Sequence, residues 1–306
     1  MNLFSSVNDD KQIGVEFQPA GVAIAQVQTG NKQPGRLLSS IFLPAVGQQA
    51  QAMALRKWVH HHDLQKCNCV CLMSADDFNI YQVEKPDADG AELVSALTWR
   101  IKDLISYEIS SVVLDFYSIP VSITNNTQQV NVVTAEQSTV ATYVECIKST
   151  GLKLVAIDIT SLVGANLNHV QQAAGETLAV LSLTESSDYL NIYHDTDLYV
   201  SRDFKIGTSQ LTVVAANDES TYESLLLKIQ RSTDYFESYY GLGSISKLLI
   251  FPQVAATEKM ATYLQSQTNF DIDFVIVSDS EEAEAANALD LHCFHAYGAA
   301  LRGIER

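Results

Sequence analysis

Alternating apolar and polar positions open the chain and predict two short strands, Gln12–Phe17 and Val22–Gln28. The turn formers Gln18-Pro19-Ala20-Gly21 join them, which is typical of a β-hairpin. Leu37–Leu43 alternates in the same way and predicts a third strand. From about Ala50 to His61 the apolar residues change to helical spacing. The beginning of the chain therefore predicts three strands followed by a helix.

The same order returns roughly 165 residues later. Leu178–Leu183 and Tyr189–His194 predict a second hairpin, Leu198–Phe204 a third strand, and about Thr221–Tyr240 a long helix. A repeated order of elements indicates a duplicated α/β domain rather than two unrelated modules. Two such domains usually face each other across a cleft, so the content of that cleft would decide the function.

Between the two copies the pattern predicts a small α+β insertion. Turn formers break the chain at Lys85–Gly90, and a helix follows at about Ala91–Ile105. Strands are predicted at Ser110–Ser118 and Val130–Thr134, and a helix at Glu136–Ser149.

These elements predict four parts of the chain. They are a flexible tail at 1–11, a first domain at 12–84 and 152–176, an insertion subdomain at 85–151, and a second domain at 177–306 whose long-helix part covers about 206–245.

Composition narrows the range of partners. The net charge of −17, from 19 basic and 36 acidic residues, argues against nucleic acid and against direct attachment to an anionic membrane. No apolar run reaches the length needed to span a bilayer, and the first residues lack the features of a secretory signal, so we expect a cytoplasmic protein. Cys67, Cys69 and Cys71 alternate on one predicted strand, which favours buried packing over a metal site. We therefore expect no metal.

The order of elements resembles that of the actin-like, sugar-kinase and Hsp70 ATPase superfamily. Three segments resemble PilM, the actin-like cytoplasmic protein of type IV pilus assembly: Thr98–Ile105 with Val113–Phe116, Lys228–Phe236, and Ala296–Gly303. Within that family the resemblance is strongest to the branch that serves mannose-sensitive haemagglutinin (MSHA) pili. It implies a duplicated actin-like, ribonuclease H-like fold of two domains with an α+β insertion subdomain, of the FtsA and PilM type.

The positions that bind nucleotide in that superfamily are altered here. The resemblance places Glu16 where an Asp normally orients metal-bound water, and Pro19 removes a backbone donor from the first turn. In the second hairpin Ser182 lies near the expected Asp, and the turn carries Thr184 and Ser186 but no glycine. Pro252 begins the segment that replaces the Gly-rich loop for adenine. We expect a vestigial cleft, no cofactor and no enzymatic activity, although Glu16 with the hydroxyls of the second turn would form the variant site of an ATP-binding alternative.

Without nucleotide chemistry, the function is expected to lie in protein contacts. The resemblance implies that the chain captures the short N-terminal cytoplasmic tail of a PilN-like bitopic inner-membrane protein, in a groove beside the insertion, and so lies peripheral to the inner membrane. The candidate groove residues are Trp99, Ile105, Tyr107, Phe116, Tyr81 and Val83. Core packing is the simpler role for most of them. Trp99 is the preferred anchor because it lies off the apolar stripe of its helix.

Two other functions remain open from the sequence. One is an active actin-like ATPase or sugar kinase, and the other is the cytoplasmic module of a type II secretion protein of the GspL kind, which shares this architecture. The sequence also leaves self-association open.

Overall fold

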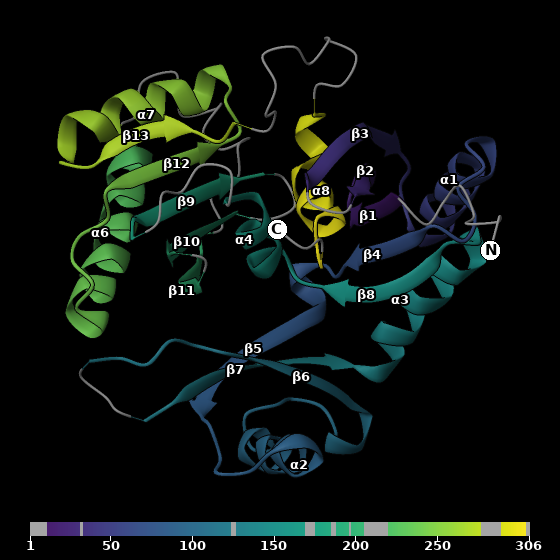
Figure 1. Cartoon of the computed structure of the whole chain (residues 1–306), viewed down its shortest axis with the longest axis horizontal. Coiled ribbons are helices and arrows are strands. Elements are labelled where there is room, and N and C mark those ends of the chain that lie inside the picture. Colours follow the sequence, from purple (N-terminus) through teal and green to yellow (C-terminus); the bar gives the residue numbers. More distant parts are fainter. Residues whose placement is uncertain are drawn as a thin grey trace. The chain divides into compact units, whose positions relative to one another are not determined.

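The first sheet is built around the predicted hairpin. The computed structural model describes residues 11–30, 33–123, 127–168, 175–184, 188–195, 197–204, 220–276 and 289–303. Strands β1 (Lys11–Gln18), β2 (Gly21–Gly30) and β3 (Gln33–Pro44) run antiparallel, and β4 (Asn68–Leu72) and β8 (Lys153–Asp158) extend the sheet in parallel. The order is β3-β2-β1-β4-β8 (Figure 1).

Helices α1 (Gln48–His61), α3 (Gln137–Thr150), α4 (Thr160–Asn168) and α8 (Phe294–Ala300) pack with this sheet. A single turn of 3-10 helix, Leu291–Cys293, precedes α8. The sequence predicted one helix over about 291–301, and the structure divides it into these two pieces.

The backbone of α8 lies directly against β1, and small residues allow this. A Cβ atom on Gly14 would lie 1.8 Å from the carbonyl oxygen of Ala296. A Cβ on Gly298 would lie 2.8 Å from the carbonyl oxygen of Val163 in α4. Only glycine fits at such distances, so these two positions fix how α8 meets the sheet and α4.

The second sheet repeats the first. It contains β9 (Thr177–Leu183), β10 (Asp188–His194), β11 (Asp197–Asp203), β12 (Lys247–Phe251) and β13 (Asp271–Phe274). Their order, β11-β10-β9-β12-β13, matches that of the first sheet strand for strand, with the same antiparallel and parallel pairings. The predicted duplication is therefore present in the described residues.

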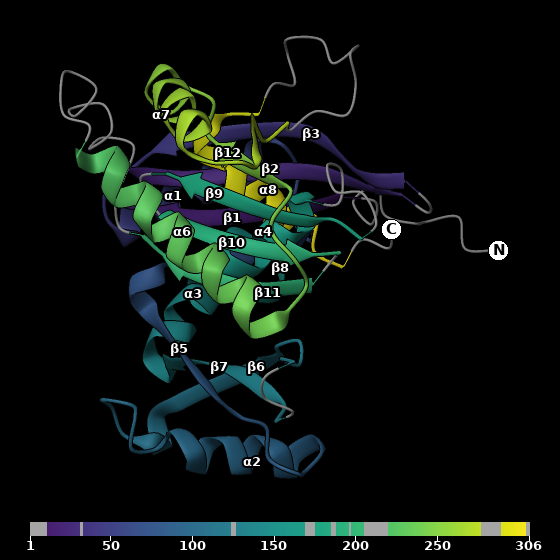
Figure 2. The same cartoon turned by 90° about the vertical axis from the view of Figure 1, so that its left-hand side faces the viewer.

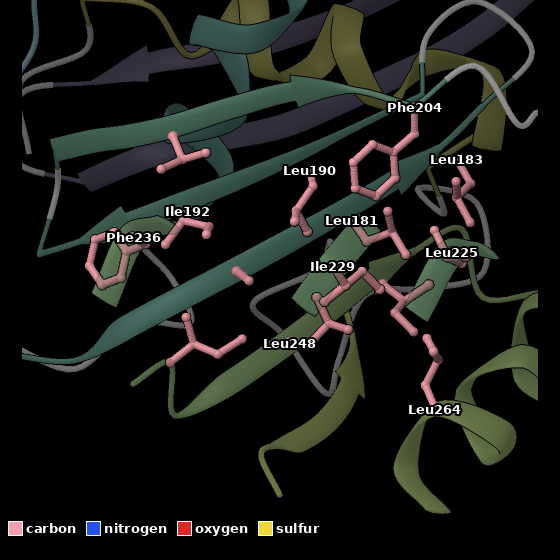
Figure 3. Packing of buried hydrophobic residues seen from close by; sticks show 14 of the residues in the cluster. Leu181, Leu183, Leu190, Ile192, Phe204, Leu225, Ile229, Phe236, Leu248 and Leu264 are labelled. Carbon is pink, nitrogen blue, oxygen red and sulfur yellow. The ribbon is translucent and has the colours of Figure 1, made fainter. Parts of the chain in front are cut away.

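The core of this half lies between the sheet and helices α6 (Ser220–Tyr240) and α7 (Ala255–Gln267). Figure 3 shows leucine and isoleucine side chains of β9 and β10 pointing toward Leu225, Ile229 and Phe236 of α6. All three of these α6 side chains are fully buried, as the helical spacing of its apolar residues requires.

The insertion subdomain has a sheet of three antiparallel strands in the order β5-β7-β6, with one helix across a face (Figure 2). Its elements are β5 (Phe78–Glu84), α2 (Gly90–Ile101), a 3-10 turn (Ile109–Ser111), β6 (Val112–Ser118) and β7 (Gln129–Glu136). A 3-10 turn at Ala75–Asp77 precedes β5.

The structure divides the chain into two compact units, with residues 1–77, 138–170 and 276–306 in the first and 78–137 and 171–275 in the second. This differs from the predicted boundaries in three places. Strand β5, expected in the first domain, pairs with β7 of the insertion. Helix α3, expected in the insertion, belongs to the first unit, where the Tyr143 hydroxyl donates to Asp77 Oδ2 over 2.6 Å. The described part of 276–306, expected in the second domain, also belongs to the first unit, because α8 packs on β1.

The predicted tail lies outside the described residues except for Lys11, which already belongs to β1. The beginning of the predicted long-helix part, up to residue 219, also lies outside the described residues. None of the helices in the described ranges combines the length and the hydropathy required to cross a bilayer.

Candidate functional site

Glu16 is held inside the first unit by other side chains. It is 5% exposed, and its Oε2 accepts a hydrogen bond from Gln18 Nε2 over 2.8 Å. Its Oε1 lies 3.3 Å from Nδ1 of His295 in α8, a histidine that is 1% exposed. Both carboxylate oxygens therefore have partners within the unit, as a buried carboxylate requires.

Gln18 extends this network to the hairpin turn. Its Nε2 also lies 2.8 Å from the carbonyl oxygen of His292, which it can reach as a donor. Its own carbonyl accepts from Gln51 Nε2 of α1 over 2.6 Å, and the same amide lies 3.2 Å from the carbonyl of Gly21. The β1–β2 turn is therefore fixed to both α1 and the segment before α8.

The turn itself offers little for binding an anion. It consists of Pro19 and Ala20, and proline has no backbone N–H to donate. Gly21 follows, but a Cβ there would lie 2.4 Å from the carbonyl oxygen of Leu43 in β3, so packing within the sheet accounts for this glycine. A phosphate cradle needs several converging N–H groups, and this turn does not supply them in the way that Gly-rich loops do.

The second hairpin buries Ser182, which the resemblance places near the Asp position of the related ATPases. Ser182 is fully buried in β9, opposite Tyr189 of β10 and Phe251 of β12. Thr184 is half-buried just after the strand, and Ser186 lies outside the described residues.

Pro252 is buried directly after β12. The resemblance places it at the start of the segment that replaces the Gly-rich adenine loop of the related ATPases. Its carbonyl accepts from Thr257 Oγ1 over 2.5 Å, and the Val254 N–H donates to the same hydroxyl over 3.0 Å. The segment thus forms a tight entry into α7.

Burial raises the pKa of two thiols near Glu16. Burial, with smaller contributions from the carboxylates of Asp290 and Glu16, raises the pKa of Cys293 to about 12. Burial, followed by neighbouring thiols and Glu16, also raises the pKa of Cys71. A protonated thiol is a poor nucleophile and a poor metal ligand. Across the described ranges, no three His, Cys, Asp or Glu side chains are placed to hold a metal ion.

Five of the six predicted partner-binding residues lie on the helix-facing side of the insertion sheet. Tyr81, Val83, Ile105 and Phe116 are half-buried and pack against the cluster of Leu93, Leu97, Ile101, Val130 and Val132. The Tyr107 hydroxyl donates to Thr134 Oγ1 over 2.8 Å. These residues pack at the edge of the hydrophobic core of the insertion, which is the core-packing role considered above for most of them.

Trp99 lies apart from them. It is 69% exposed on the side of α2 away from the buried leucines, and Lys102 Nζ lies 4.8 Å from the centre of its ring. Val94, Leu104 and Ile109, along α2 and the segment after it, are also exposed, at 40%, 54% and 43%. This series of exposed apolar side chains was not predicted beyond Trp99.

His295 and Gln51 were also missed as members of the Glu16 network. Gln51 had a detectable signal, since it is a polar residue in the buried series Gln51, Leu55, Trp58 and Val59 of α1. His295 had none, because its partner is 279 residues away in the chain.

Comparison with known proteins identifies a family for this sequence. Residues 51–218 match the sequence profile of a family described as type IV pilus assembly protein PilM. No curated protein matches the sequence of this chain.

Solved structures show the fold. The chain matches a structure described as a PilM-PilN type IV pilus biogenesis complex with a TM-score of 0.71 and 18% identity, over 98% of this chain and 99% of the other. A Bacteroides thetaiotaomicron protein with an actin-like ATPase fold and unknown function matches with a TM-score of 0.51 and 9% identity, over 94% and 96% of the two chains. The cytoplasmic domain of EpsL, an inner-membrane component of the type II secretion system of Vibrio cholerae, matches at 0.47 and 14%, over 85% and 97%. The first two likenesses confirm the predicted actin-like fold.

Proposed function

This chain belongs to the family of the type IV pilus assembly protein PilM, and we propose that it is a non-catalytic scaffold of a type IV pilus machine. In this role it captures the N-terminal cytoplasmic tail of a PilN-like inner-membrane protein and is held in the cytoplasm beside that membrane by its partner. The observation that carries the proposal is the family match, which covers more than half of the chain. The structure described as a PilM-PilN complex, which matches nearly the whole chain, supports the choice of partner.

Within the family we propose an MSHA-type pilus system and a relation to its biogenesis protein MshI. The support is the overall resemblance noted above, which is strongest to the branch that serves MSHA pili. The corresponding partner would be the PilN-like protein of the same inner-membrane platform.

A scaffold role without ATP turnover is supported by the state of Glu16. The carboxylate that would orient metal-bound water is bonded to Gln18 and lies beside His295, and Pro19 occupies the turn that would face phosphate. Recruiting Glu16 to a magnesium site would break contacts that bury it. We therefore expect millimolar Mg-ATP to leave the melting temperature unchanged in differential scanning fluorimetry. A rise of several degrees, with ATP hydrolysis above background, would instead favour an ATPase.

The tail-binding surface is proposed to include Trp99 and the exposed apolar side chains around α2. An exposed tryptophan is typical of an interface anchor, because it brings a large rigid surface at low entropic cost. Binding of a fluorescent tail peptide should weaken about 10-fold or more in Trp99→Ala, with an unchanged melting temperature.

Ile123→Ala is the matched control, since Ile123 is also 69% exposed but lies in the β6–β7 loop. Its affinity should stay within about twofold of the wild type. If Trp99→Ala binds as tightly as the wild type, Trp99 is not the anchor. If the wild type does not bind the tail at all, the partner assignment fails.

A further inference from the structure

Two segments of the first unit are nearly free of acidic residues in an otherwise acidic chain. Residues 45–75 contain one acidic side chain, Asp63, and residues 146–157 contain none. The chain average of 36 acidic residues in 306 would give about five in these 43 positions. Acidic charge is therefore segregated away from these segments.

The fold brings the segments together at one edge. Helix α1 ends just before β4, helix α3 ends just before β8, and β4 and β8 are parallel neighbours with Asn68 opposite Lys153. The Lys66 N–H donates to the Gly151 carbonyl over 2.8 Å, and the Lys153 N–H donates to the Cys67 carbonyl over 2.9 Å. Both helix ends and both strand beginnings are therefore neighbours.

Exposed cationic side chains lie in and beside these neighbouring helix ends and strand beginnings. They are Arg56, Lys57, Lys66, Lys148 and Lys153, and we call them the basic edge. The exposed imidazoles of His60, His61 and His62 lie in the same segment. The exposed acidic side chain within the two segments is Asp63, and the exposed Glu145 of α3 lies just before the second segment.

Helix capping explains only part of this arrangement. Cations stabilise the negative end of a helix dipole, which accounts for His60, His61 and Lys148. Lys66 and Lys153 lie outside the helices, and Arg56 and Lys57 precede the last residues of α1. The dipole gives no reason for the absence of acidic residues along the rest of α1.

The outer side of α1 suggests what contacts the edge. Its inner side buries Leu55, Trp58 and Val59, while Met53 is 58% exposed one turn before Lys57. Exposed basic side chains on a helix without acidic ones are what the negative surface potential of an anionic bilayer attracts. An acidic protein surface would match these charges too, and the nearness of a membrane under the proposed function favours the bilayer.

We propose that the basic edge contacts the anionic headgroups of a bilayer. The proposal rests partly on the proposed function, because a tail anchored in a membrane would keep this chain within reach of lipid. It also revises the expectation from net charge: lipid headgroups respond to charge within about one Debye length of roughly 8–10 Å, not to the total of −17.

Vesicle co-sedimentation tests this without any protein partner. The full chain should bind phosphatidylcholine vesicles that contain about 30% phosphatidylglycerol at about 100 mM salt, should not bind pure phosphatidylcholine, and should dissociate at about 500 mM salt. The triple variant Lys57→Glu, Lys66→Glu, Lys153→Glu should lose about 100-fold in affinity.

The triple variant Lys85→Glu, Arg231→Glu, Lys259→Glu is the matched control, because it changes the net charge equally at other places. It should stay within about threefold of the wild type. Equal losses in both triples, or no binding of the wild type to anionic vesicles, would overturn the proposal. Binding to polyglutamate but not to vesicles would also overturn it and would assign the edge to an acidic protein. Tail-peptide affinity, measured separately, tells whether the proposed function stands in each case.

Discussion

Glu16 and His295 are 279 residues apart in the chain, yet their side chains approach to 3.3 Å. The sequence identified Glu16 as the residue that replaces the metal-orienting Asp of related ATPases, but it could not reveal the histidine beside it. A long-range pair of this kind leaves no local pattern, because neither residue's neighbours depend on the other's identity. The observed pairing supports the proposal that Glu16 has a structural role.

If the pair is structural, the two residues should be coupled in stability. Glu16→Ala and His295→Ala should each lower the free energy of unfolding, and the double variant should lose about 1–3 kcal/mol less than the sum of the two. Urea unfolding followed by far-ultraviolet circular dichroism measures this coupling. Combining Glu16→Ala with Thr257→Val, whose hydroxyl bonds only within the separate second unit, should give simple additivity. Additivity in both cycles would show that Glu16 and His295 do not support each other.

Gly14 offers a second test at the residue scale. Gly14→Ala would place a methyl group on the backbone of α8, which cannot move like a side chain, so we expect a loss of about 3 kcal/mol. Gly47→Ala is the comparison, because its surroundings are open and only its φ of +86° opposes a side chain. It should cost about 1 kcal/mol. Equal melting temperatures of the two variants would contradict the close approach of α8 to β1.

Among the elements, the strands of both hairpins and the long helix of the second half could be predicted, because alternation and helical spacing are local signals. The sheet that each strand joins was harder to predict from the sequence. Strand β5 alternates like any half-buried strand, and only its pairing of Tyr81 with Val132 reveals that it belongs to the insertion. Helix α8 was recognised from its small residues, but its place beside Gly14 depends on two ends of the chain meeting. The candidate site shows the same difference between local and long-range signals. Helical spacing places Trp99 off the apolar stripe of α2, and this was predicted. The Glu16 network joins residues far apart in the chain and was not predicted.

Strand β13 lies at the edge of its sheet, and side chains satisfy its outward N–H groups. Gln265 Oε1 accepts from the Ile272 N–H over 3.0 Å, and Asp273 Oδ1 accepts from the Phe274 N–H over 2.8 Å. Such bonds make an edge less available to other strands.

The Asp273 bond should make stability depend on pH. The Phe274 N–H, with a smaller contribution from Lys247, lowers the pKa of Asp273 in the folded protein below that of the unfolded chain. A carboxylate whose pKa is lowered by folding stabilises the protein at pH values above its unfolded pKa of about 3.9. This contribution to stability is lost as the pH falls through the folded pKa. The melting temperature of Asp273→Asn should therefore lie below that of the wild type at pH 7 and approach it near pH 3. Asp271→Asn, at the exposed start of the same strand, is the control, and an equal pH response in both variants would exclude the bond as the cause.

At the scale of the whole molecule, the insertion and the second domain share a core. Ile119, at the beginning of the β6–β7 loop, is 6% exposed within the cluster of Figure 3, and the Ser122 hydroxyl donates to the Tyr239 carbonyl in α6. Ile119→Ala should therefore destabilise the second unit by about 3 kcal/mol. Val121→Ala, two residues away and 54% exposed, should change stability by less than about 0.5 kcal/mol. Hydrogen exchange of the α6 amides measures where the loss occurs, and unchanged exchange in Ile119→Ala would mean that the loop does not support this core.

The place of α8 has a consequence for the order of folding on the ribosome. Strand β1 is synthesised first, but the helix that covers it is synthesised about 280 residues later. At synthesis rates of about 5–20 residues per second, this leaves β1 without its covering helix for roughly 14–56 seconds. The second unit ends at residue 275 and has all its strands before α8 emerges. The first sheet is therefore covered by α8 only after the second unit has been synthesised, and during that interval the nascent chain exposes a sheet that chaperones can bind.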